Sequence, residues 1–178
     1  NSLLSYTILP GWDVKSSFGI TDTQHDETRT QPSTLYDPAY EAGPEFSSLY
    51  VTKNTRRSWI VEPQVSWAHQ WNYGKTEVLA GGTFQQQKSG NLLLEANGFA
   101  SNSLIYNLAS AFSVLTLRDQ QTDYKYQAIF GRLNYSYKER YILNLTGRRD
   151  GSSRFGPGLQ FATFGAIGAA WLFSDEPF

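Results

Sequence analysis

The stretch from Arg148 to Pro157 holds the densest group of reactive side chains in the chain. The group consists of Arg148, Arg149, Asp150, Ser152, Ser153 and Arg154. A serine nucleophile needs an adjacent base, and this stretch contains neither His nor Lys. We therefore expect no catalysis here. Arg148, Arg149, Asp150 and Arg154 predict a charge network at the end of a strand; the plainer alternative is a solvated loop, because exposed ion pairs contribute little.

Metal and cofactor chemistry has no clear candidate either. The chain has no Cys, and its two histidines, His25 and His69, stand far apart in the sequence. Asp22, Asp26 and Glu27 are acidic, but their spacing matches no defined calcium loop. A formal net charge of −1 gives no electrostatic reason to expect a nucleic-acid partner. We predict no catalytic, cofactor or metal site and no enzyme.

The elements that carry these residues read as β-strands. In the clearest run, Trp59, Val61 and Val65 alternate with Glu62 and Gln64, which is the period of a strand. No apolar run reaches the roughly 18 residues of a membrane-spanning helix. The fold class is therefore all-β, an antiparallel up-and-down meander of about seven long strands. The predicted strands are 3–9, 12–24, 57–70, 76–87, 122–137, 141–149 and 160–173.

Alternation alone also fits a soluble sheet with one wet face, such as a carbohydrate-binding module. Two features favour a membrane barrel instead. Several predicted strands exceed the usual five or six residues and reach the roughly 9–11 that a membrane strand needs. Short and long connections also alternate, as in outer-membrane barrels. The short ones are 10–11, 71–75 and 138–140, and the long ones are 25–56, 88–121 and 150–159.

Aromatic residues gather at the short-turn ends of the predicted strands. Amphipathic rings of Trp and Tyr favour the boundary between membrane and water. We therefore predict a membrane-interface girdle there. Its members are Trp12, Trp67, Trp71, Tyr135, Tyr137, Tyr141 and Trp171.

The other face of the predicted sheet is polar and has to line an interior. It carries Glu62, Gln64, Arg132, Asn144 and Arg148. A basic residue at the middle of the lipid costs about 2–4 kcal/mol, which excludes this face from the lipid. Seven strands are too few to enclose such an interior, and they leave two strand edges unpaired. The chain is therefore predicted to be part of a larger barrel, with its first and last strands paired outside it.

Loop 88–121 is too long for a plain connection. Leu104, Leu108, Ala111, Phe112 and Leu115 recur at helical spacing, which predicts a short helix capped by Asn102 or Ser103. The helix either packs on its own loop or offers a lid or docking surface. For the second case, the candidate ligand or partner contacts are Phe99, Leu104, Tyr106 and Phe112.

A resemblance to a known family covers residues 128–178. The stretch FGRLNYSYKERY at 130–141 is similar to a barrel segment of the SusC/RagA family of TonB-dependent outer-membrane transporters. The similarity continues through Leu143, the 148–156 stretch, Phe164, Trp171 and the SDEPF stretch at 174–178. Residues 57–87 resemble the preceding hairpin more loosely. Phe161 and the Gly165-Ala166 step depart from the family pattern, but both changes keep a strand.

The resemblance implies that residues 1–178 are part of the β-barrel domain of a protein whose full barrel has about 22 strands. It also implies a plug domain and a TonB-contacting motif, which this chain lacks. The expected partners are a SusD-like surface lipoprotein, the TonB complex and outer-membrane lipid. The expected role is import of glycans or peptides across the bacterial outer membrane, with the cargo left unspecified.

Overall fold

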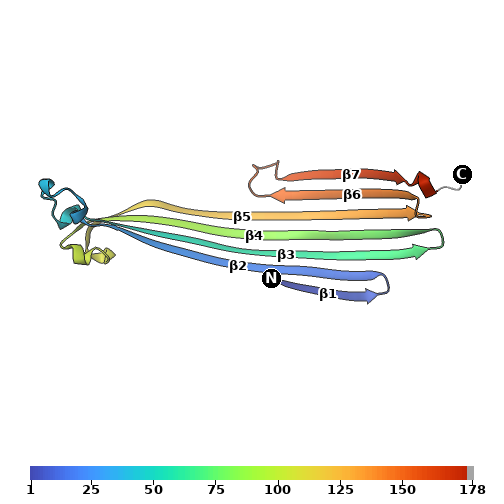
Figure 1. The fold of residues 1–178 in the computed structure, drawn as a ribbon, viewed down its shortest axis with the longest axis horizontal. Coiled ribbons are helices and arrows are strands. Elements are labelled where there is room, and N and C mark those ends of the chain that lie inside the picture. Colours follow the sequence, from blue (N-terminus) through green and yellow to red (C-terminus); the bar gives the residue numbers. More distant parts are fainter. Residues whose placement is uncertain (176–178) are drawn as a thin grey trace. The chain divides into compact units, whose positions relative to one another are not determined.

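The computed structural model describes residues 1–175 and contains one seven-stranded antiparallel sheet (Figure 1). Neighbours in the chain are neighbours in the sheet, in the order β1-β2-β3-β4-β5-β6-β7. The strands are β1 (Ser2–Leu9), β2 (Trp12–Gln31), β3 (Ser48–Trp71), β4 (Gly74–Phe99), β5 (Ala111–Tyr137), β6 (Tyr141–Ser152) and β7 (Phe161–Trp171). The up-and-down meander confirms the predicted fold class. Among the described residues, no helix combines the length and the apolar character needed to cross a membrane.

The chain divides into two compact units. Unit 1 comprises residues 1–20, 58–87 and the described part of 124–178, and unit 2 comprises residues 21–57 and 88–123. Strands β2, β3, β4 and β5 contribute residues to both units.

Strand register sorts the side chains of unit 1 onto two faces. In the three-strand ladder, Leu133 pairs with Leu145, which pairs with Ile167. One residue along, Arg132 pairs with Thr146 and Asn134 with Asn144. Because successive side chains of a strand point to opposite sides, these two sets lie on opposite faces. We call them the apolar face (Leu133, Tyr135, Leu143, Leu145, Ile167, Trp171) and the polar face (Arg132, Asn134, Asn144, Thr146, Arg148, Asp150).

Tight turns join the strands of unit 1 at one end. The β1–β2 turn contains Gly11, whose φ of 83° is costly for any residue with a side chain. The Gly11 carbonyl also accepts a 2.8 Å hydrogen bond from the Ala68 amide of β3. A Cβ at Gly11 would lie 2.3 Å from the Ala68 carbonyl oxygen. Glycine is therefore required both by the backbone conformation and by the close approach of β3.

Unit 2 has a small apolar core under its two connecting loops. Leu49, Ala96, Phe99 and Ile105 form the core, and Val51, Leu108 and Ala111 pack against it. Beside it, the Ser47 hydroxyl accepts a 2.8 Å hydrogen bond from the Ser33 amide and donates a 2.5 Å bond to Asn102 Oδ1. The Asn102 amide in turn donates to the Ser33 hydroxyl at 3.1 Å. These bonds tie the loop at 32–47 to the loop at 100–110.

The strand and loop boundaries differ from the prediction in one consistent way: strands β2 to β6 extend further. The loops predicted at 25–56, 88–121 and 150–159 shrink to 32–47, 100–110 and 153–160. The segment that β2 adds, 25–31, is polar on both faces. It lacks hydrophobic alternation, so pairing with the neighbouring strands decides its conformation.

The helix predicted in the 88–121 loop was wrong. Two short 3-10 helices stand there instead, Asn102–Leu104 and Leu108–Ser110, and Ala111 begins β5. The cap also differs: the Ser101 side chain accepts from the Ser103 amide, and Asn107 caps the second helix. Phe112 and Leu115 therefore belong to a strand, where pairing with β4 outweighs their helical spacing.

The sheet is open within the described residues, because β1 and β7 stand at opposite ends of the strand order. Residues 176–178, the end of the SDEPF stretch, lie outside the described residues.

Replacing Gly11 by Ala should destabilise the protein more than replacing Gly158 by Ala. Both glycines have positive φ, 83° and 84°, so both variants carry the left-handed cost of about 1–2 kcal/mol. Nothing lies within 4 Å of a Cβ at Gly158, whereas Gly11 meets a backbone oxygen. We expect an additional loss of about 1–3 kcal/mol for Gly11→Ala, measured by thermal unfolding of the purified protein. Equal shifts in the two variants would contradict the packing argument.

Replacing Asn102 by Ala should loosen both loops of unit 2. The change leaves the buried hydroxyls of Ser33 and Ser47 short of partners, which costs about 1–3 kcal/mol. Hydrogen exchange should accelerate in residues 32–47 as well as 100–110. Asn107→Ala is the matched control, because Asn107 caps only its own turn and should affect only residues 107–110. Unchanged exchange at 32–47 in the Asn102 variant would refute the linkage.

Candidate functional site: two faces and an outer loop

Aromatic rings form two contacting rows at the tight-turn end of unit 1. In the first row, Trp12 and Trp67 lie 6.0 Å apart between ring centroids, and His69 links Trp67 to Trp71. In the second row, Tyr141 contacts both Tyr137 and Trp171 at 6.3 Å. The structure therefore brings the predicted girdle residues together, with Tyr135 on the same face as Tyr137.

Six of the seven girdle rings remain exposed, and the seventh, Trp67, is partly buried. Trp12, Trp71 and Trp171 expose 42%, 50% and 56% of their surface. The Trp71 indole donates a 2.9 Å hydrogen bond to the Thr76 hydroxyl, so the polar edge of this ring is partnered. No second sheet covers these rings among residues 1–175, as a soluble sandwich would require. Half-exposed rings with a satisfied polar edge suit a boundary between apolar and aqueous surroundings.

The opposite face carries a hydrogen-bonded polar network. Glu62 accepts hydrogen bonds from Ser17 at 2.9 Å and from Thr83 at 3.3 Å, which joins β2, β3 and β4. Lys75 and Glu77 form an ion pair of 2.5 Å on β4. Mutual pairing lowers the cost of placing these charges on one wall, but leaves the face hydrophilic.

The predicted charge network of Arg148, Arg149, Asp150 and Arg154 is brought together only in part. Arg148 Nε lies 2.6 Å from Asp150 Oδ1, and its Nη2 donates to the Tyr126 hydroxyl at 2.6 Å. The Tyr126 hydroxyl donates to Asp150 at 3.2 Å, which closes a three-residue network on the polar face. Tyr126 was not predicted, although its register opposite Ser152 places it on that face.

Arg149 and Arg154 do not join this network. Arg149 is one residue from Arg148 and therefore points to the apolar face, where it lies 5.0 Å from the Phe161 ring centroid. The Arg154 guanidinium lies 4.4 Å from the Tyr124 ring centroid. Both contacts are cation–π contacts, so the predicted four-residue network is split across two faces.

The candidate contact residues predicted in loop 88–121 also separate. Phe99 is only 2% exposed and belongs to the core of unit 2, so it cannot contact a ligand as predicted. Phe112, Tyr106 and Leu104 are 94%, 75% and 40% exposed. These three remain available for contact with a partner or a cargo.

A polar cluster crosses three strands of unit 2. The Tyr50 hydroxyl donates a 2.9 Å hydrogen bond to Glu95, and the Arg29 guanidinium lies 4.7 Å from the Tyr50 ring centroid. The hydrogen bond to the Glu95 carboxylate raises the pKa of Tyr50 above its ordinary value, and burial adds to the shift. The phenol therefore stays protonated and the cluster acts as a fixed structural link. The part of the chain described by the structure contains no group of three or more potential metal-binding side chains.

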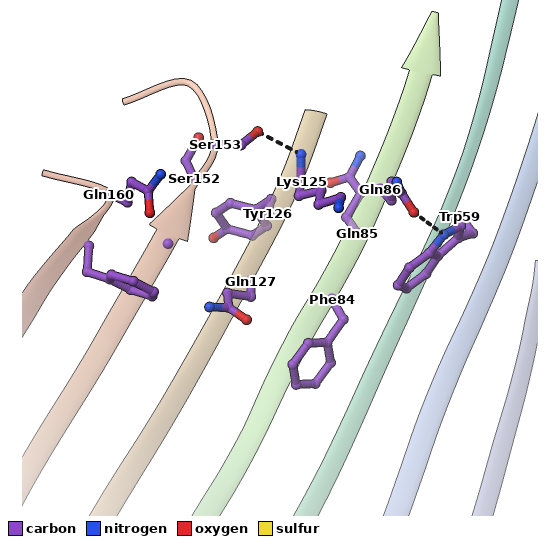
Figure 2. A pocket seen from close by; sticks show the side chains of 12 residues that line it. Trp59, Phe84, Gln85, Gln86, Lys125, Tyr126, Gln127, Ser152, Ser153 and Gln160 are labelled. Carbon is purple, nitrogen blue, oxygen red and sulfur yellow. Dashed lines mark hydrogen bonds between the residues drawn. The ribbon is translucent and has the colours of Figure 1, made fainter. Parts of the chain in front are cut away.

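Sequence reasoning missed a groove on the apolar face of unit 1 (Figure 2). Its volume is about 400 Å³, and it is lined by residues of β3 to β7. Gln127, Gly151 and Phe161 face each other directly across β5, β6 and β7. A signal was available in the sequence: Gln127, Arg149 and Gly151 have odd numbers, like the apolar residues Leu133 and Leu145.

Two TonB-dependent receptors of Formosa agariphila match nearly the whole chain. One is 25% identical over 100% of the chain, and the other is 27% identical over 98%. The TonB-dependent receptor SusC of Bacteroides thetaiotaomicron is 45% identical over a shorter segment, 28% of the chain. The chain spans 18% of the length of the two Formosa receptors and 5% of SusC in the matched segment.

Solved structures show the same fold. A structure of the RagAB peptide transporter superposes with a TM-score of 0.84 at 20% identity, over 97% of this chain and 19% of that one. The RagAB peptide importer in its closed-closed state gives a TM-score of 0.81 over the same share. No family model matches the sequence. Along its whole length the chain is thus similar to a partial segment of TonB-dependent receptors, and its seven-stranded antiparallel meander has the fold of a segment of RagAB.

Proposed function

We propose that this chain forms part of the wall of an energy-coupled outer-membrane importer that takes up nutrients. The observation that carries the proposal is the sorting of side chains in unit 1. An apolar face ends in exposed aromatic rings, and the opposite face holds a hydrogen-bonded polar network. Transmembrane barrels use the first arrangement toward lipid and the second toward a polar lumen.

The similar proteins support a transport role rather than an enzymatic one. The sequence relatives are named as TonB-dependent receptors, and the structural neighbours as a peptide transporter. The polar face, with its network of Arg148, Asp150 and Tyr126, supplies hydrogen bonds and charge to a passing solute. We infer that the cargo is a glycan or a peptide.

We further propose that the exposed end of unit 2 docks a SusD-like lipoprotein. Phe112, Tyr106 and Leu104 present apolar surface to solvent, and the Ser33–Ser47–Asn102 network holds the loops beneath them. Large exposed apolar side chains on an ordered scaffold are typical of a protein-binding surface.

Probes on adjacent residues of β6 should report opposite surroundings. The chain has no Cys, so Leu145→Cys and Thr146→Cys each add one labelling site to this segment. In the full receptor, freed of other cysteines and placed in bilayers with brominated lipid, a fluorophore at 145 should be strongly quenched. The same fluorophore at 146, one residue away on the polar face, is the matched control and should be quenched little. Equal quenching at both positions would contradict a lipid-facing wall.

Charges at the exposed end of unit 2 should disrupt docking. The double variant Leu104→Asp and Phe112→Asp places two carboxylates in the proposed interface, and we expect loss of the lipoprotein on co-purification with the full receptor. Leu115→Asp is the matched control, because Leu115 is 51% exposed but lies three residues along β5, on the other face of the strand from Phe112. Normal co-purification of the double variant would refute the docking surface.

A further inference from the structure

We propose that the groove on the apolar face of unit 1 binds the phosphorylated headgroup of an anionic glycolipid in the outer leaflet. The inference rests on the proposed function, because it requires this face to meet lipid. The proposed function requires only that the apolar face contact lipid in general. The groove would in addition bind one specific class of lipid.

The groove lies one membrane thickness along the strands from the girdle. Lys125 and Trp59 line it, and they precede the girdle residues Tyr137 and Trp71 by twelve residues on β5 and β3. Twelve residues rise about 40 Å along a strand and, at a barrel tilt of about 40°, about 30 Å across the membrane. That height matches the hydrocarbon thickness of about 30 Å. With the girdle at one boundary, the groove lies at the opposite boundary, where headgroups are.

Aromatic rings and polar side chains line the groove together. The rings of Trp59, Phe84 and Phe161 are 40%, 38% and 50% exposed and offer apolar surface to acyl chains. Polar side chains stand among these rings: Gln86 accepts from the Trp59 indole at 3.4 Å, and Gln127 and Ser153 also line the groove (Figure 2). Amide and hydroxyl groups beside aromatic rings suit the hydroxyl groups of a sugar.

The positive charge at the groove favours an anionic ligand. Lys125 lines the groove, and the Arg149 guanidinium lies against Phe161, another lining residue. None of the twelve lining residues is Asp or Glu. A basic residue at the lipid-facing surface is costly at the middle of the membrane but favourable beside anionic headgroups, by about 1 kcal/mol each. Two such residues next to sugar-compatible groups point to a phosphorylated glycolipid.

Backbone geometry keeps the groove open. Gly151 lies directly opposite both Gln127 and Phe161, and a Cβ there would come within 2.6 Å of the Phe161 ring. Any larger residue at 151 would push Phe161 aside. The groove therefore has a floor of glycine backbone, with the ring of Phe161 as one wall.

Native mass spectrometry of the full receptor should detect the bound lipid. The probe is bisphosphorylated lipid A in mixed micelles, compared with chemically dephosphorylated lipid A and with phosphatidylglycerol. We expect preferential retention of the bisphosphorylated form. Lys125→Gln and Arg149→Gln should each weaken binding about fivefold, and Lys125→Arg should preserve it. Lys15→Gln is the matched control: Lys15 is also exposed but pairs with Ser5 on the polar-face side of β2, next to Ser17.

The outcomes separate this inference from the function beneath it. Equal retention of phosphorylated and dephosphorylated lipid A, or equal weakening by Lys15→Gln, would overturn the headgroup site. If the probe at 145 is nevertheless quenched by brominated lipid, the wall function stands and only the specific site fails. If neither 145 nor 146 is quenched, the apolar face does not meet lipid and both proposals fail. Displacement of the lipid by inorganic phosphate alone would also overturn the site as a lipid-binding groove.

Discussion

The hydrogen-bonded register between neighbouring strands is the constraint on which the rest of this structure depends. A strand that pairs along its whole length cannot rotate, so each side chain is committed to one face. The pairing of Leu133 with Leu145 and of Leu145 with Ile167 aligns three apolar side chains in one step. A slip of one residue on β6 would place Thr146 and Arg148 among them. Register therefore creates the two surfaces, and the surfaces carry the function.

The same constraint explains why the two units differ. In unit 1 the faces are chemically distinct, and few side chains need to be buried inside the chain itself. In unit 2 the segment 25–31 is polar on both faces and only a small apolar core is buried, so stability needs further sources. It comes from cross-strand pairs such as Tyr50 with Glu95 and Ser48 with Asn97, and from the small core around Leu49 and Phe99. A sheet with water on both faces needs these links because burial contributes little.

How much could be predicted from the sequence follows from this difference. The strand ending at Trp71 was found because Trp59, Val61 and Val65 alternate with polar residues, which is a signal of burial or lipid contact. Residues 25–31 were missed because both faces are polar and only the neighbouring strands hold the backbone extended. The helix expected near Leu104 and Leu108 failed for a related reason. Their spacing of four fits two short 3-10 turns, each capped by its own side chain, as well as it fits an α-helix.

Phe99 shows a second limit of the sequence. An aromatic residue in a long loop was read as a contact for ligand, yet it ends β4 and is buried in the core of unit 2. Gly98, with a φ of 77°, immediately precedes it and breaks the regular extended backbone at that point. No single-sequence pattern reports such a local reversal. Phe112, at the start of the next strand, is almost fully exposed, so the two rings have opposite roles despite similar surroundings in the sequence.

Arg148 and Arg149 are neighbours in the chain but lie on opposite faces of the sheet. They are adjacent and chemically identical, and the sequence gives no reason to treat them differently except parity. Register sends Arg148 to the polar face, where Asp150 and Tyr126 neutralise and orient it. It sends Arg149 to the apolar face, where its guanidinium lies 5.0 Å from the ring centroid of Phe161. A cation–π contact supplies only about 0.5–2 kcal/mol, so a cation on an apolar wall is stabilised further by an anion. The unusual residue of the pair is therefore Arg149, and an anionic headgroup at that height accounts for its position.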